Sequence, residues 1–439
     1  IAEPLSRSDI PSRMELRTKK FLDFSLGGIF IGLLKPFVML LGRTLHRDHT
    51  PELRERLAVI KLMGGGSLVI ALPALLGLRN RYPHCHFTLV TTPAIAPFGE
   101  AIGVFDEIVV LDDRSVGRLL ASTFSALSRL GGVDTVIDLE VYSRLTTVLS
   151  ALTRARNRVG FYLETVFWRE GLSTHLIFFN RFSGNHNFYE AVAALFGAEA
   201  ASRTACAEHV TGRLLRETGG ALPKPPPMPK MNTTHAALGF ACSDLARERM
   251  LSPDQWARVL PPRLRGITDV HLLGSQSDRE SASVLLTRLE SDLPAIRWHN
   301  DCDGRPLEES LRTLSECSLF VGIDSAMIHF ARLFGLPTKS FWGPTDPSTL
   351  LKDFDPAREE ATYVKIPCSP CIHVAEVPPC RGNNVCIAMA VALATAGPRP
   401  DHDAIVQPLY WLAPGNRSSL SGAAQAVQVV ETREDVAGP

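Results

Sequence analysis

The run Asp324–His329 places a carboxylate, a hydroxyl and an imidazole directly after an apolar segment. The preceding residues Leu319–Ile323 are typical of a buried strand, and the small residues Ser325 and Ala326 are expected to open a helix. Free backbone amides at a helix start, together with the helix dipole, bind phosphate groups. His329 follows on the same helical face and leans toward the helix start. The pattern predicts a diphosphate site, although a capped core helix with a buried histidine would look the same.

Elements that could position this run recur in both halves of the chain. Segments typical of buried strands are Leu57–Leu62, His86–Thr91, Glu107–Leu111, Thr135–Leu139, Ala236–Phe240, Asp269–Leu273, Leu319–Ile323 and Thr338–Phe341. Helical stretches separate them, which predicts an α/β fold with parallel sheets covered on both faces. Because ligands of such sheets bind beyond the carboxyl ends of the strands, two doubly wound domains are expected to face a cleft.

Composition sets the domain boundaries. A chain of 439 residues is too long for one hydrophobic core. The proline-rich segment 223–230 is expected to be a semi-rigid linker between domains at 51–222 and 231–394. The remainder, 395–439, is expected to be a loose tail in which Val406–Leu412 packs back. The formal net charge of zero argues against a nucleic-acid partner.

Residues 1–50 form a basic and apolar segment. Its basic residues before the apolar stretch include Arg13, Arg17, Lys19 and Lys20. Phe21–Gly42 has the outline of a signal peptide, but we find no small-residue cleavage site. A spanning helix needs about 20 nearly uncharged residues, whereas Asp23 and the pair Lys35-Pro36 interrupt this one. We expect an interfacial or hairpin-like membrane anchor; the alternative is an apolar helix packed on the protein's own surface.

Motifs that follow one another along the chain resemble those of glycosyltransferase family 9, the heptosyltransferases. Asp324–His329 and Phe341–Pro347 resemble the family signatures Asp-Ser/Thr-Gly-x-x-His and Phe-Gly-Pro-Thr-Asp-Pro. Lys61–Leu75 resembles the opening strand, loop and helix of the family, and Cys368–Cys386 resembles its C-terminal cysteine segment. The resemblance runs from about Leu57 to Ala390.

The resemblance implies a GT-B fold, with two Rossmann-like domains, and an inverting, metal-independent glycosyl transfer without a cofactor. The domain at 51–222 would bind a lipopolysaccharide-type or lipid-linked acceptor. The domain at 231–394 would bind a nucleotide-diphosphate sugar, for which heptose is a candidate. Such an enzyme would act in the cytoplasm, peripherally at the inner face of the bacterial cytoplasmic membrane.

Two positions depart from the family pattern. The family usually carries Gly-Asp where this chain has Gly66-Ser67, and that aspartate is taken to be the general base that deprotonates the acceptor hydroxyl. Ser67 cannot replace it, because a hydroxyl is not ionised at pH 7; we expect it to cap a helix running toward Arg79 or to position the acceptor. Ala326 replaces the motif's glycine but keeps the backbone amide.

A substitute base is sought at the end of the predicted strand Thr135–Leu139. Glu140 is the candidate, since this strand end points toward the cleft, and Asp138 is expected to cap or brace the strand end. A salt-bridged structural glutamate is the alternative interpretation of Glu140. His186, in a polar loop, is a second candidate base.

Further donor-site residues follow from the resemblance. Ser243 and Arg249 resemble the family segment in which a hydroxyl and a basic side chain hold the donor phosphates. Arginine suits a diphosphate because its planar guanidinium donates two parallel hydrogen bonds. Gln276 loosely matches an acidic family residue that contacts the nucleotide ribose.

The cysteine segment allows more than one interpretation. Cys368 and Cys371, then Cys380 and Cys386, have components of a thiolate metal site. The second spacing is unusual for zinc, so buried thiols or disulfides that fix the segment are favoured over a metal, and we assign no metal ligand.

The sequence leaves three functions to consider: an epimerase, a binding scaffold and an active glycosyltransferase. An epimerase would need paired acid and base groups around one sugar, and no such pair is found in the sequence. A catalytically degenerate scaffold that binds a nucleotide sugar or glycan is favoured by the missing aspartate. An active glycosyltransferase is favoured by the donor motifs that the chain retains.

Overall fold

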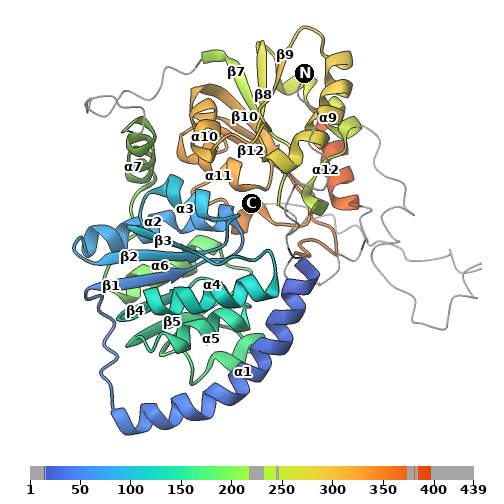
Figure 1. Cartoon of the computed structure of the whole chain (residues 1–439). Coiled ribbons are helices and arrows are strands. Elements are labelled where there is room, and N and C mark those ends of the chain that lie inside the picture. The colour runs from blue at the N-terminus through green and yellow to red at the C-terminus, as the bar shows by residue number, and fades with distance from the viewer. Residues whose placement is uncertain are drawn as a thin grey trace, which may run out of the picture.

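The computed structural model describes residues 14, 16–216, 232–243, 247–372, 380 and 384–396. The expected linker at 223–230, the segment Val406–Leu412 and Arg13 lie outside these residues. The described chain forms two six-stranded sheets with helices on both faces (Figure 1). The predicted α/β fold of GT-B type is thus confirmed.

The first sheet has the strand order β3-β2-β1-β4-β5-β6, with all neighbours parallel. Its strands are β1 Arg56–Ile60, β2 His86–Thr91, β3 Glu107–Val110, β4 Thr135–Asp138, β5 Asn157–Tyr162 and β6 His175–Phe178. Its helical elements are α2 Gly65–Arg81, α3 Ala96–Ile102, α4 Val116–Arg129, α5 Arg144–Leu152, η1 Glu164–Arg169, α6 Asn185–Leu195 and α7 Arg203–Arg216. Side chains of β1 alternate between two clusters: Leu57 and Val59 pack with α2 and α6, whereas Ala58 and Ile60 pack with α4 and α5.

The second sheet has the order β12-β11-β10-β7-β8-β9, again parallel throughout. Its strands are β7 Asn232–Gly239, β8 Asp269–Leu272, β9 Arg297–Asn300, β10 Cys317–Ile323, β11 Thr338–Trp342 and β12 Glu359–Tyr363. Its helical elements are η2 Arg247–Arg249, α8 Pro253–Val259, η3 Pro261–Arg263, η4 Gln276–Asp278, α9 Arg279–Asp292, α10 Leu307–Glu316, α11 Ala326–Leu333, η5 Pro347–Thr349 and α12 Val385–Thr395. In both sheets, the strand of the expected motif, β1 or β10, lies near the centre.

The two domains share one hydrophobic cluster. Residues of α2, α6 and α7, which follow the strands of the first sheet or lie between them, and of α10 and α11 of the second domain belong to this cluster. Phe98 and Phe330 stack across the boundary with ring centroids 6.4 Å apart. Lys352 also forms an ion pair with Glu190 at 2.5 Å. The carboxyl ends of β1 and β10 are thereby held toward each other.

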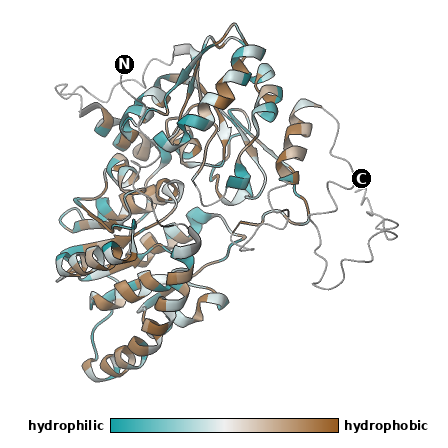
Figure 2. Cartoon of the chain, turned by 45° about the vertical axis from the view of Figure 1, so that its right-hand side comes forward, coloured by the Kyte–Doolittle hydropathy of each residue, from teal (hydrophilic) through white to brown (hydrophobic). Residues whose placement is uncertain are grey.

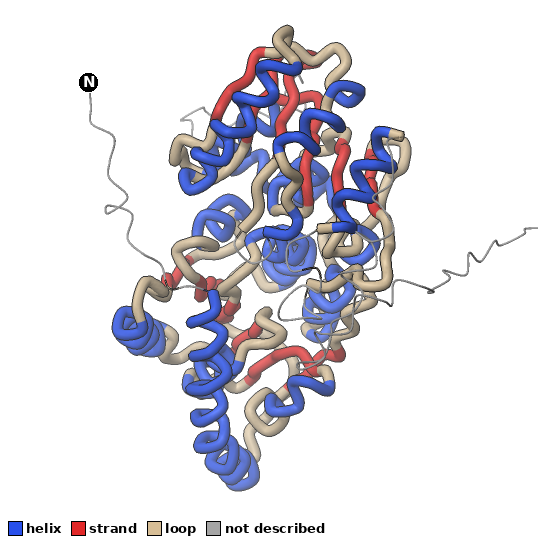
Figure 3. Tube along the Cα trace, turned by 90° about the vertical axis from the view of Figure 1, so that its right-hand side faces the viewer, coloured by secondary structure: helices blue, strands red, loops and turns tan. Residues whose placement is uncertain are grey.

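The first described helix, α1 Leu16–Leu45, runs along the outside of the first domain (Figure 3). Gly27, Ile31, Leu34 and Val38 follow helical spacing on its inner face, and the last three pack against α5 and η1. The outer face exposes large apolar side chains, and apolar residues line most of the helix in Figure 2. Those more than half exposed are Phe21, Phe24, Ile29, Leu33, Phe37, Leu40 and Leu45. By length and composition Thr18–Leu45 could also cross a membrane.

The boundary expected at residue 50 therefore does not separate α1 from the domain. Ile31 is buried with Val148 and Trp168, so removal of α1 would expose this small cluster to water. One face of α1 is structural, and only the opposite face is free for a partner.

Candidate active site

The predicted phosphate-binding run lies where the sequence places it, between β10 and α11. Asp324 is buried and accepts a hydrogen bond from Nη1 of Arg249 at 3.1 Å. Ser325 precedes α11, yet its Oγ atom makes no capping bond and is buried without any hydrogen-bond partner in the described chain. Oγ1 of Thr345, after the neighbouring parallel strand β11, is buried and unpaired in the same way. Burying a hydroxyl without a hydrogen-bond partner costs free energy. Two such hydroxyls at the carboxyl ends of neighbouring strands therefore indicate a place for a polar ligand.

His329 is buried on α11. Burial lowers the pKa of its imidazole to about 4, because the nearby Asp324 carboxylate only partly offsets desolvation and the neighbouring Arg332 and Arg249 add to the lowering. The imidazole is therefore neutral at pH 7. It can donate one N–H hydrogen bond without bringing a charge.

Arg249 is the cation of this site. Burial alone would lower the pKa of its guanidinium, but the Asp324 carboxylate and the Cys242 thiol together outweigh that effect and raise it. Ser243 is exposed and follows Cys242, whose thiol interacts with Arg249. Gln276 is exposed at the start of η4, beside Gly304. The structure thus brings Arg249 to the Asp324 run and leaves Ser243 and Gln276 on the surface.

The loop after β1 forms the opposite side. Gly64, with φ of 79°, is the N-cap of α2, and Ser67 is the third residue of the helix. The expectation that Ser67 caps this helix is wrong. Gly64 adopts a left-handed conformation, which glycine reaches without steric cost, and the helix therefore begins at Gly65, before Ser67. The Ser67 side chain is instead hydrogen-bonded to Tyr189 of α6.

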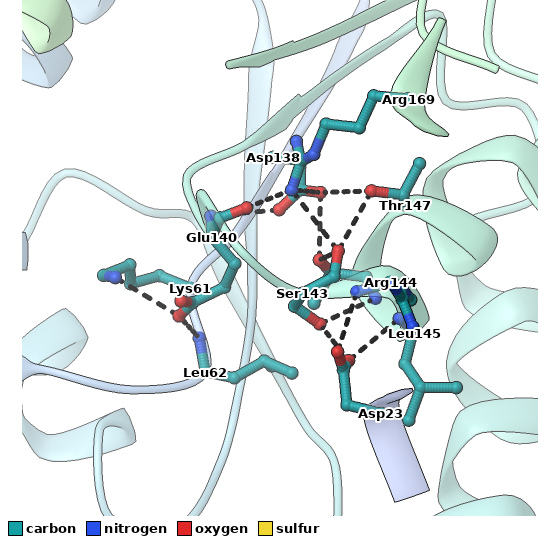
Figure 4. A network of polar contacts seen from close by, with 11 residues as sticks. Asp23, Lys61, Leu62, Asp138, Glu140, Ser143, Arg144, Leu145, Thr147 and Arg169 are labelled. Atoms are coloured by element: carbon teal, nitrogen blue, oxygen red, sulfur yellow. Dashed lines mark hydrogen bonds and ion pairs between the residues drawn. The ribbon is translucent and has the colours of Figure 1, made fainter. Parts of the chain in front are cut away.

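Glu140 is buried directly after the strand β4. Its Oε1 atom accepts hydrogen bonds from Nζ of Lys61 at 3.2 Å and from the backbone N–H of Leu62 at 2.7 Å (Figure 4). A third comes from the backbone N–H of Met63 at 2.9 Å. Among the described residues no hydrogen bond to the other oxygen, Oε2, is found. Burial alone would lower the pKa of Lys61, but Glu140, together with Tyr189 and Asp138, outweighs this and raises it. Glu140 therefore holds the loop before α2 and keeps one oxygen available.

Asp138 braces the same strand end, as expected. Its carboxylate accepts the Glu140 backbone N–H at 3.0 Å and the Thr146 hydroxyl at 2.9 Å, and forms an ion pair with Arg169 at 3.2 Å. Burial raises the pKa of Asp138 to about 6, although Arg169 acts in the opposite direction. These bonds use the Asp138 carboxylate to fix the backbone around Glu140.

The start of α2 meets the start of α11 at Gly66. A Cβ atom added there would lie 3.1 Å from Cδ2 of His329 and 3.3 Å from Cα of Ala326. Glycine at this position thus allows the start of α2 to approach the start of α11. The acceptor side and the donor side predicted from the sequence are therefore neighbours in space.

His186, the second candidate base, lies at the start of α6. Burial lowers the pKa of its imidazole, and its Nδ1 atom is buried without a hydrogen-bond partner in the described chain. Charged groups that act on it include Glu190 and Lys352. It thus lies at the domain boundary, whereas Glu140 accepts the hydrogen bonds from the loop after β1.

Sequence reasoning missed three residues around this strand end, which contact Glu140, Asp138 or Ser67. Lys61 carries a weak signal, because a lysine directly after an apolar strand is unusual in a core. Arg169 is fully buried in η1, and Tyr189 is buried in α6. No spacing in the sequence connects these two residues to the strand end, and only the packing of η1 and α6 brings them there.

The four C-terminal cysteines line one pocket together with Glu248 and Pro344. All four are free thiols, so the disulfide interpretation does not hold in this structure. Burial raises the pKa of Cys371 to about 11 and that of Cys386 to about 12. Within the described residues, no group of three or more His, Cys, Asp or Glu side chains is placed to hold a metal ion. The backbone N–H of Cys371 donates to the Pro344 carbonyl at 3.0 Å, which fixes the segment on the loop after β11.

Comparison with models of protein families and with curated protein sequences found no match. Solved structures do match. A glycosyl transferase family 9 protein from Veillonella parvula has 18% identity and a TM-score of 0.53, covering 72% of this chain and 87% of its own. E. coli ADP-heptose lps heptosyltransferase II has 14% identity and a TM-score of 0.52, with 71% and 91% covered. E. coli heptosyltransferase WaaC with ADP has 16% identity and a TM-score of 0.54, with 70% and 92% covered. The chain therefore has the two-domain fold of these glycosyltransferases.

Proposed function

We propose that this protein is an inverting glycosyltransferase of the family 9 type. It transfers a sugar, with heptose as the first candidate, from a nucleotide-diphosphate donor to a lipopolysaccharide-type or lipid-linked saccharide. The observation that carries the proposal is the start of α11, where the Ser325 hydroxyl is buried and unpaired close to the Arg249–Asp324 ion pair.

The donor diphosphate would lie at the start of α11. The helix amides and the Arg249 guanidinium carry positive charge, and the neutral His329 imidazole supplies a further N–H donor. Negative charge grows on the diphosphate as the sugar leaves, so preorganised donors stabilise the transition state more than the ground state. The structure of an E. coli heptosyltransferase with ADP makes ADP the first nucleotide to test.

The acceptor would approach from the β1 loop. In our proposal Oε2 of Glu140 takes the proton of the acceptor hydroxyl, and the acceptor oxygen attacks the anomeric carbon from the face opposite the leaving diphosphate, so the configuration inverts. Lys61 and the Leu62 and Met63 amides hold Oε1 and so orient the carboxylate. No cofactor takes part in this scheme.

The apolar outer face of α1 supports attachment to a membrane. A helix with one face docked on its own domain and the other rich in exposed Phe, Leu and Ile suits the interface of a bilayer. A lipid-linked acceptor would be presented there. We place the protein at the inner face of the cytoplasmic membrane of a bacterium.

The donor site is tested by calorimetric titration with ADP, GDP and UDP. We expect His329→Ala to weaken binding of the preferred nucleotide by about tenfold or more, the loss expected for a hydrogen bond to a charged group. His299→Ala is the matched control, because His299 lies on the edge strand β9 and pairs with Asp269. Unchanged binding in His329→Ala would refute the assignment.

A catalytically degenerate scaffold is the second candidate. It is favoured by Ser67 at the position of the family base and by the three donors that already occupy Oε1 of Glu140. Tight nucleotide binding without transfer to any acceptor, and without donor hydrolysis, would support it.

A further inference from the structure

Asp23 is an acidic residue within the apolar helix α1, and it faces the first domain. Its carboxylate accepts a hydrogen bond from the Ser143 hydroxyl at 2.6 Å and from the backbone N–H groups of Arg144 and Leu145, both at 3.0 Å (Figure 4). These are the amides at the start of α5, where a carboxylate also interacts favourably with the helix dipole. A residue of one helix thus helps to cap another.

The capped position lies three residues after Glu140. At the other end of this short segment, Asp138 accepts the Glu140 N–H, and the Arg169 guanidinium donates to the Glu140 carbonyl. Arg169 also donates to the Ser143 carbonyl at 3.4 Å, so it joins both ends of the segment. The backbone from Glu140 to Ser143 is therefore held from both sides.

We propose that Asp23 is a positioning residue for Glu140 and, through Glu140, for the loop before α2. The inference rests on the proposed role of Glu140 as the base. When Asp23 holds Ser143 and Arg144, the backbone of Glu140–Ser143 has few accessible conformations. The Glu140 carboxylate therefore keeps its hydrogen bonds to Lys61 and to the Leu62 and Met63 amides. Without Asp23 the start of α5 loses three hydrogen bonds, and Glu140 gains freedom.

This proposal gives α1 a second role besides membrane attachment. The guanidinium of Arg144 reaches the carbonyl of Phe24 at 2.9 Å and lies 4.1 Å from the centre of its ring. The turn of α1 that carries Asp23 and Phe24 is therefore docked on the start of α5, although the Phe24 side chain stays more than half exposed like the rest of the outer face. Membrane contact and the geometry of the candidate base are then set by one helix.

Amide hydrogen exchange of the full-length protein in detergent tests the coupling without requiring activity. In Asp23→Ala we expect the peptide that contains Leu62 and Met63 to exchange about tenfold faster than in the wild type. Asp23→Asn keeps one acceptor oxygen and should give a smaller increase. Asp48→Ala is the matched control: it removes an aspartate from the same N-terminal region that bonds Thr50 and not α5.

Kinetics supply the second measurement. We expect Asp23→Ala to lower kcat by about tenfold while the affinity for ADP stays unchanged, since general-base geometry acts on the chemical step. Faster exchange at Arg144 and Leu145 with unchanged exchange at Leu62 and Met63 would overturn the inference, because the cap would be lost without any effect on the loop. A wild-type protein without transferase activity would refute the proposed function, and the exchange result would still decide the coupling.

Discussion

The variant Glu140→Gln tests whether Glu140 acts as the general base or only holds the loop before α2 in place. The amide oxygen of glutamine can still accept from the Leu62 and Met63 amides, but it cannot neutralise the ammonium of Lys61. The Lys61 and Glu140 side chains are only 7% and 10% exposed. Breaking a buried ion pair of this kind costs about 3–5 kcal/mol of unfolding free energy. Removal of a general base lowers turnover by about 10²–10⁴-fold.

A double variant, Lys61→Met with Glu140→Gln, distinguishes the two effects. Methionine has a similar length and no charge, so most of the lost stability should return. Turnover should remain low if Glu140 takes the proton. If Glu140 only supports the loop, turnover should recover together with stability.

The assay pairs urea unfolding with the rate of sugar transfer from the preferred donor. Donor affinity, measured by calorimetry, should be nearly the same in all three proteins. Near-normal turnover in Glu140→Gln, or restored turnover in the double variant, would refute the assignment and leave His186 or substrate-assisted chemistry. Raised activity in Ser67→Asp would indicate that the chain has lost an ancestral base.

Three further predictions concern stability and membrane binding. Between about pH 6.5 and pH 4 the unfolding free energy should fall as the pH falls, because His329 takes up a proton at about 6.5 in the unfolded state and only near 4 in the folded state. Urea unfolding of His329→Gln should lack this pH-dependent loss of stability. Gly77→Ala should lower the unfolding free energy by about 1–3 kcal/mol, because the added Cβ would overlap the backbone carbonyl of Glu199. Replacement of Leu33 and Phe37 by serine should lower binding to lipid vesicles by about tenfold or more in a sedimentation assay.

Each of these predictions has a control. The pKa of Asp138 is raised to about 6, so its contribution to stability rises as the pH falls below 6; it is present in the wild type and in His329→Gln and cancels in their difference. Gly117→Ala, where the added Cβ meets no atom within 4 Å, should not destabilise the protein. Val284→Ser changes an exposed apolar residue of the second domain and should leave vesicle binding unchanged. Equal losses in a control and its test variant would contradict the corresponding prediction.

Local pattern in the sequence determined much of the fold. Apolar segments between helical stretches predicted eight of the strands, because strands near the middle of a parallel sheet are buried on both faces and read as apolar runs. β9 and β12 were missed since they lie at sheet edges and carry polar residues such as Arg297 and Glu360. β5 and β6 were missed as well; β6 is one edge of the first sheet, whereas the strand at the other edge, β3, was predicted.

The donor run was also determined locally. Asp324, Ser325 and His329 are close in the sequence, so the strand end and the helical spacing suffice to place them on one helix start. Their burial and the neutral state of His329 needed the surrounding domain. Arg249 was found only through the family resemblance, since its pairing with Asp324 joins residues 75 positions apart.

Only the tertiary structure decided the arrangement around Glu140, the proposed acceptor side. The donors to the Glu140 carboxylate lie 77 to 79 positions away in the sequence, and the donors to the Asp23 carboxylate lie 120 to 122 positions away. Such hydrogen bonds cannot be predicted from the periodicity of apolar residues in the sequence. They form between elements that come together only when the sheet and its covering helices assemble. For the same reason the sequence could show that α1 is apolar, whereas the structure determined which face is docked and which is free.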